Sequence, residues 1–70
     1  MLSKELFNKG INKLVIEFKD KGFNMTKERA EQWYEYLKIC TDEGFDKRIN
    51  NTLKTCKAAP TMADVFNNVR

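Results

Sequence analysis

The sequence predicts an all-α fold: a small, compact bundle of four helices forming a single domain over residues 1–70. Three observations support this prediction. The chain is 41% hydrophobic and 33% charged, which is too apolar for a disordered chain. It holds 3 Gly and 1 Pro in 70 residues, too few turn residues for a small all-β domain. Its apolar residues recur at helical spacing behind residues that favour helix N-caps.

The first helix is expected to begin at the N-cap Ser3 and to run to about Lys21. Gly22 then supplies the left-handed residue that ends many helices. Gly10 interrupts the pattern at a cost of about 1 kcal/mol relative to Ala, which indicates tight packing or a bend. The apolar stripe of this helix is Phe7, Ile11, Leu14, Val15 and Phe18.

Thr26 is the expected N-cap of the second helix. Met25 before the cap and Ala30 at the fourth helical position suit a hydrophobic staple. The stripe that follows predicts one buried face. Its members are Ala30, Trp33, Tyr34, Leu37 and Cys40.

A third helix is expected behind Thr41 or Asp42, either of which is a good N-cap. Asp42 and Glu43 would favour its positively polarised first turn. The link to the second helix is then very short, which favours antiparallel or steeply angled neighbours. The stripe of the third helix is Phe45, Ile49, Thr52, Leu53 and Cys56.

The fourth helix is expected to start at Thr61-Met62-Ala63-Asp64, a capping box in which Asp64 replaces the usual Glu. Its apolar face is Met62, Val65, Phe66 and Val69, and no stop signal follows this face before Arg70. We therefore expect a flexible C-terminal tail beyond the domain. Thr26, Thr61 and Asp64 are assigned to capping rather than to partner recognition.

The four stripes are expected to form one core. Cys40 and Cys56 each close a stripe, so both thiols are expected to be reduced and mostly buried. The core should centre on Ile11, Leu14, Phe18, Trp33, Leu37, Phe45, Ile49, Leu53 and Phe66.

The residue types argue against catalysis and against a cofactor or metal site. The chain has no histidine, the commonest general base and metal ligand. Two cysteines fall short of the four ligands of a structural zinc site, and the three glycines are isolated, so no phosphate-binding loop is present. Asp42, Glu43 and Asp46 are interpreted as helix-stabilising acids rather than a weak cation site. The protein is not expected to be an enzyme.

The charge pattern argues against direct nucleic-acid binding. The net charge of +3 comes from 13 basic and 10 acidic residues that interleave along the chain, whereas DNA-binding modules concentrate their bases. The fourth helix also opens with Met62, Ala63 and Asp64, which are poor base readers. No apolar run reaches the roughly 20 residues of a membrane span, and no export signal precedes the first helix. A cytoplasmic protein without direct membrane contact is expected.

Three apolar residues fall off the expected stripes. Leu6, Tyr36 and Ile39 lie roughly 100° or more from the centres of the apolar faces of their helices, at about 100° per residue. Single exposed apolar residues are common in monomers. These three are nevertheless the residues that the sequence offers as a partner-binding surface.

Four segments together resemble a known family. They are Phe23-Asn24-Met25-Thr26, then Trp33 with Leu37, then Phe45, and finally Ala59-Pro60-Thr61-Met62-Ala63-Asp64-Val65. From about Phe7 to Asn67 the chain resembles the N-terminal domain of the phage-encoded loader and inhibitor of the replicative DNA helicase, a family also found in prophages of Gram-positive bacteria.

The resemblance implies a phage or prophage replication accessory protein that binds the replicative helicase in the bacterial cytoplasm and holds it inactive. It also implies delivery of the helicase to an origin-bound initiator protein. In this family a flexible C-terminal segment helps to grip the helicase, and this sequence ends about where that segment would begin. The competing interpretations are a small DNA-binding regulatory module and a phage structural or assembly protein.

Overall fold

Residues 2–68 are described by the computed structural model, and within this range the chain forms four α-helices and no strand. The helices are α1 (Lys4–Phe18), α2 (Lys27–Leu37), α3 (Asp42–Thr55) and α4 (Met62–Asn67), with a 3-10 turn η1 (Lys19–Lys21) after α1. The all-α prediction is confirmed. α1 ends at Phe18, three residues before the expected end at Lys21. Residues 19–21 instead form the 3-10 turn η1, which is followed by Gly22 in the left-handed region (φ 87°).

Each helix begins at a side-chain N-cap, as the sequence predicts. The hydroxyl oxygens of Ser3, Thr26 and Thr41 accept hydrogen bonds from backbone amides three residues ahead, at 3.0 to 3.2 Å. The capping box at α4 is complete: Thr61 Oγ1 accepts from the Asp64 amide at 3.3 Å, and the Thr61 amide donates to Asp64 Oδ2 at 2.9 Å. These bonds satisfy amides that have no partner inside a helix.

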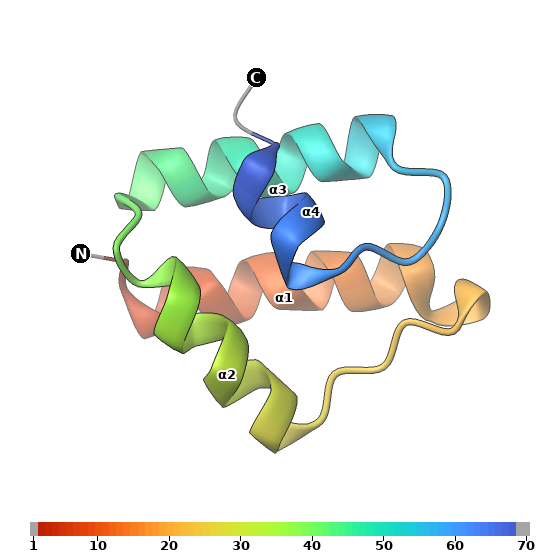
Figure 1. Cartoon of the computed structure of the whole chain (residues 1–70), viewed down its shortest axis with the longest axis horizontal. Helices are drawn as coiled ribbons and strands as arrows, with labels where there is room; N and C mark the ends of the chain where they lie inside the picture. The colour runs from red at the N-terminus through yellow and green to blue at the C-terminus, as the bar shows by residue number, and fades with distance from the viewer. Residues whose placement is uncertain (1, 69–70) are drawn as a thin grey trace.

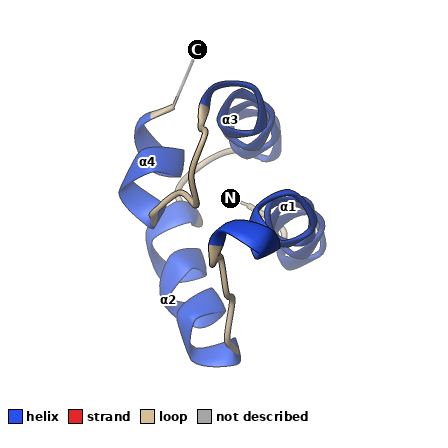
Figure 2. Ribbon diagram, turned by 90° about the vertical axis from the view of Figure 1, so that its right-hand side faces the viewer, coloured by secondary structure: helices blue, strands red, loops and turns tan. Residues whose placement is uncertain are grey.

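The helices form two layers. In Figure 1 both α1 and α3 run from left to right, so they are parallel, and Figure 2 shows them on one side of the molecule with α2 and α4 on the other. The most extensive helix contact is between α1 and α3. A Cβ atom built on Gly10 would lie only 2.5 Å from Phe45 Cε2, so the glycine permits this close approach.

The core follows the expected stripes with several differences. Seven of the nine expected core residues are buried, but Leu53 and Phe66 are half-buried at its edge. Leu2 and Phe23, which lie outside the helices, are buried although the periodicity gives no signal for them. Val65 is the fully buried residue of α4, while Val69 lies outside the described residues.

The cysteine prediction is only partly correct. Both thiols are free, but Cys40 lies in the link after α2 rather than on the helix, and Cys56 is half-buried. The two residues flank α3, whose 14 residues span about 21 Å. They therefore lie at opposite ends of that helix and cannot approach each other.

Arg48 and Asn68 fasten α4 to α3. Arg48 Nε donates to the carbonyl oxygen of Phe66 at 2.9 Å, and its guanidinium lies 5.6 Å from the Phe66 ring centroid. Asn68 Nδ2 donates to Thr55 Oγ1 at 3.0 Å, and the Asn51 amide group donates to the Asn68 carbonyl at 3.4 Å. These bonds satisfy polar groups at the end of a helix of only six residues.

Candidate functional site

Tyr36 and Ile39 are the apolar residues that α2 and its following link leave in solvent. The Tyr36 side chain is 55% exposed and Ile39 is 74% exposed. Tyr34, which packs edge-on against Phe7 of α1 with ring centroids 5.2 Å apart, lies two residues before Tyr36. Because two residues correspond to about 200° of helix rotation, Tyr36 projects from the side of α2 away from α1.

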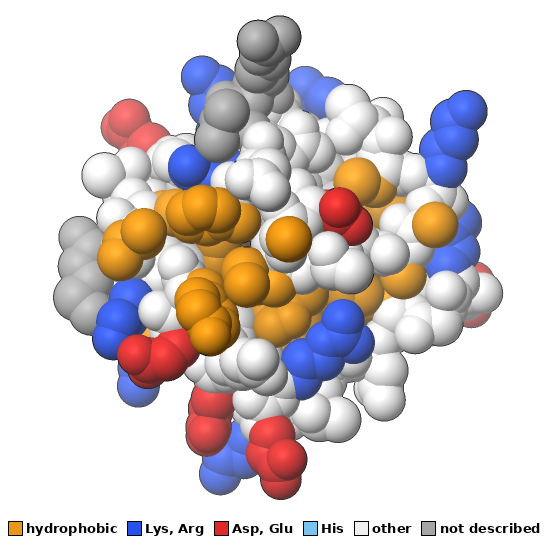
Figure 3. All heavy atoms as spheres, viewed as in Figure 1, with side chains coloured by type: hydrophobic (Ala, Val, Ile, Leu, Met, Phe, Trp, Pro, Cys, Tyr) orange, Lys and Arg blue, Asp and Glu red, His pale blue; other side chains and the backbone are white. Residues whose placement is uncertain are grey.

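Apolar side chains gather on the face of the molecule that α2 and α4 share (Figure 3). On α4 the half-buried side chains are Met62 and Phe66, which pack against the core and keep part of their surface in solvent. We call Tyr36, Ile39, Met62 and Phe66 the α2–α4 face. Exposed apolar side chains that gather on one face are typical of an interaction site.

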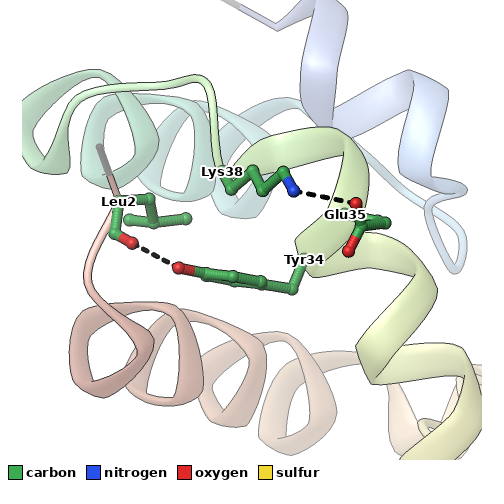
Figure 4. A network of polar contacts seen from close by, with 4 residues as sticks. All are labelled: Leu2, Tyr34, Glu35 and Lys38. Carbon is green, nitrogen blue, oxygen red and sulfur yellow. Dashed lines mark hydrogen bonds and ion pairs between the residues drawn. The ribbon is translucent and has the colours of Figure 1, made fainter.

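The N-terminal segment holds the end of α2 and the link that carries Ile39. The Tyr34 hydroxyl donates to the Leu2 carbonyl at 2.7 Å (Figure 4), and the Leu2 amide donates to the Lys38 carbonyl at 3.1 Å. Leu2 itself is 1% exposed. These two hydrogen bonds therefore hold the backbone on either side of Tyr36 and next to Ile39.

A surface ion pair lies next to this end of α2. The Lys38 ammonium donates to Glu35 Oε1 at 2.8 Å (Figure 4). This hydrogen bond, together with the attraction of the same carboxylate, raises the pKa of Lys38 above its ordinary value of 10.5. Lys38 is therefore fully charged at neutral pH.

Leu6 does not share the exposure expected for it, and the sequence prediction is wrong on this point. The residue is half-buried and packs against the core. The start of α3 approaches α1 here, because the Ser3 amide donates to Asp42 Oδ1 at 2.9 Å. Ser3, Leu6 and Asp42 line the same small depression of about 290 Å³.

Ile16, which was not among the residues predicted from the sequence, is also 66% exposed. It lies about 170° around α1 from the centre of the buried stripe, so the same helical-wheel reasoning that selected Tyr36 identifies it. Ile16 lies on α1, outside the α2–α4 face, and provides a comparison residue of the same type.

A groove of about 460 Å³ lies between α1 and α2. Phe7, Ala30 and Tyr34 supply its apolar lining, and Lys4 and Glu31 are among its charged residues. The Lys4 ammonium lies 5.7 Å from the Tyr34 ring centroid. The Tyr34 hydroxyl in this groove already donates to the Leu2 carbonyl.

Both arginines in the described range serve the fold. Arg48 binds the end of α4 as described above, and Arg29 Nη1 donates to the Asn24 carbonyl at 2.8 Å. The Arg29 guanidinium also lies 5.4 Å from the Phe23 ring centroid and 5.6 Å from that of Trp33. These contacts hold both guanidinium groups against carbonyls and aromatic rings of the same chain.

Comparison with known proteins adds no further assignment. No protein-family model, curated protein sequence or solved structure gives a significant match to the chain. Within residues 2–68 no helix has the length and apolar character needed to cross a bilayer, and no three His, Cys, Asp or Glu side chains are grouped to hold a metal ion.

Proposed function

We propose that the chain is a non-catalytic accessory protein of phage or prophage DNA replication that binds the replicative helicase, holds it inactive and helps to deliver it to an origin-bound initiator. The observation that carries a protein-binding role is the exposure of Tyr36 and Ile39 on the α2–α4 face. The identity of the partner rests on the resemblance described in the sequence analysis.

The physical basis for binding is the area that these side chains would remove from water. Each Å² of apolar surface buried is worth roughly 25 cal/mol, and aromatic residues such as Tyr are enriched at the energetic centres of interfaces. Tyr36 offers a large side chain with only two rotatable angles to fix. The surrounding bundle holds it in place, since Trp33 and Leu37 on the same helix are buried.

The test uses the full chain and the replicative helicase of the bacterium whose genome or phage encodes it. Binding is measured by analytical size exclusion and by titration calorimetry, and inhibition by the helicase's DNA-stimulated ATPase and unwinding rates. We expect a stable complex with reduced unwinding. The variant Tyr36→Ser/Ile39→Ser should bind at least tenfold more weakly, with an unchanged helical circular dichroism spectrum.

Ile16→Ser is the matched control, because it removes an isoleucine of similar exposure from α1. It should bind the helicase as the unmodified chain does. Absence of any complex, or equal binding by the Tyr36→Ser/Ile39→Ser variant, would overturn the proposal.

A further inference from the structure

The parallel arrangement of α1 and α3 places the C-terminal ends of both helices at the same end of the molecule, which faces the viewer in Figure 2. Lys19 and Lys21 follow α1, and Lys54 and Lys57 lie at and after the end of α3. More than 30 residues separate the two pairs in sequence. We call these four residues the lysine end.

The lysine end carries most of the net charge of the chain. The last turn of α1 with residues 19–21, together with residues 54–57, contains four lysines and two acidic residues, Glu17 and Asp20, which gives +2 of the protein's net charge of +3. The rest of the chain carries nine basic and eight acidic residues. The charge that looks dispersed along the sequence is concentrated by the fold.

The four lysines are free to meet a ligand. All four are exposed, and the ion pairs formed within residues 2–68 are Lys13–Asp46 and Lys38–Glu35. Helix C-termini do attract cations, but each contributes only about half a negative charge. Two such termini together with Glu17 and Asp20 leave about one positive charge uncompensated.

We propose that the lysine end contacts the phosphate backbone of DNA without reading its sequence. Lysine ammonium groups are point charges suited to phosphates, whereas protein interfaces are depleted in Lys and enriched in Arg and aromatic residues. Among residues 2–68, Ile16 on α1 is the one large exposed apolar residue near these lysines in sequence. An acidic protein surface is therefore the less favoured partner.

This phosphate contact is not sequence-specific binding. The residues at the start of α4 argue only against the reading of bases. It requires neither the α2–α4 face nor the helicase, so it does not depend on the proposed function. Four neutralised phosphates predict a slope of log binding constant against log salt of about −3.6 on duplex and about −2.8 on single strands. Between 50 and 200 mM salt, affinity for duplex should fall on the order of a hundredfold.

The experiment titrates the full chain into a labelled duplex of about 20 base pairs, and separately into one of its strands, and follows fluorescence anisotropy from low to moderate salt. The test variant is Lys19→Gln/Lys21→Gln/Lys57→Gln, which keeps Lys54 because it stabilises the last turn of α3. Its slope on duplex should shrink to about −0.9, as one remaining phosphate contact predicts.

The matched control is Lys9→Gln/Lys27→Gln/Lys47→Gln, which has the same net charge but an intact lysine end. It should retain the slope of the unmodified chain. The proposal is wrong if the unmodified chain does not bind DNA at the lowest salt, or if both variants lose affinity equally. It is also wrong if polyglutamate displaces the DNA as well as unlabelled DNA does, since that result indicates a site for acidic proteins. Thermal unfolding of all three proteins separates these outcomes from a loss of structure.

Discussion

Gly10 is the residue at which α1 and α3 come closest, and Gly10→Ala is the sharpest test of their packing. A methyl group there would lie 2.5 Å from Phe45 Cε2, 2.8 Å from Phe45 Cζ and 3.0 Å from Ile49 Cγ1. Favourable carbon contacts are about 3.5 to 4.0 Å. Phe45 is 0% exposed and Ile49 is 1% exposed, so neither side chain has open space into which to move.

Two opposing effects decide how much Gly10→Ala changes the free energy of unfolding. Alanine is favoured over glycine in a helix interior by roughly 0.5 to 1 kcal/mol, whereas overpacking a filled core costs typically about 1 to 3 kcal/mol. Because the clash involves a buried ring on a neighbouring helix, the upper part of that range applies. We expect a net loss of about 2 kcal/mol in the free energy of unfolding, which for a domain this small lowers Tm by about 8 to 16 °C.

The assay is thermal and urea unfolding followed by circular dichroism. A second-site variant distinguishes the clash from other causes: Phe45→Leu removes the ring atoms that the new methyl group would meet. Gly10→Ala should therefore cost less in the Phe45→Leu background than in the unmodified chain, and the difference is the coupling free energy of the pair. A Gly10→Ala protein with an unchanged or higher Tm would refute the close approach of α1 and α3.

Three further variants test the polar contacts. Thr61→Ala should lower the free energy of unfolding by about 0.5 to 2 kcal/mol through loss of the α4 cap, as measured by urea unfolding. Tyr34→Phe should cost about 0.5 to 1.5 kcal/mol and speed amide exchange at Leu2, because the Leu2 carbonyl loses its donor. Glu35→Gln should lower the pKa of Lys38 toward 10.5 in an NMR titration. Since the partner raises this pKa, its contribution to stability is complete below pH 10.5 and is lost as pH rises through the folded-state pKa.

Local signals predicted most of the fold. A helix N-cap is a hydrogen bond between one side-chain oxygen and a backbone amide within three residues of it. Ser3, Thr26 and Thr61 could therefore be identified as caps from the sequence. Helical periodicity located the main core for the same reason, because a buried stripe such as Leu14 and Phe18 repeats within a single helix.

Contacts between distant segments were not predictable in this way. Leu2 is buried because its backbone pairs with the link after α2 and its side chain reaches the core, and nothing near it in sequence marks that contact. Leu6 lies off the stripe of α1, but the start of α3 covers it through the Ser3–Asp42 bond. Tyr36 and Ile39 were found from the helical wheel because no distant segment covers them.

The parallel direction of α1 and α3 determines where the two proposed binding surfaces lie. Because α3 starts beside the start of α1, α2 must return toward that end, and the Ser3–Asp42 and Leu2–Lys38 bonds fix it there. Ile39 therefore lies near the start of α3, and the lysine end lies beyond its last turn, about 21 Å away along the helix. Substitutions this far apart, with no shared contact, act additively. The helicase experiment and the DNA experiment can consequently succeed or fail independently, and a variant at one surface serves as a folding control for the other.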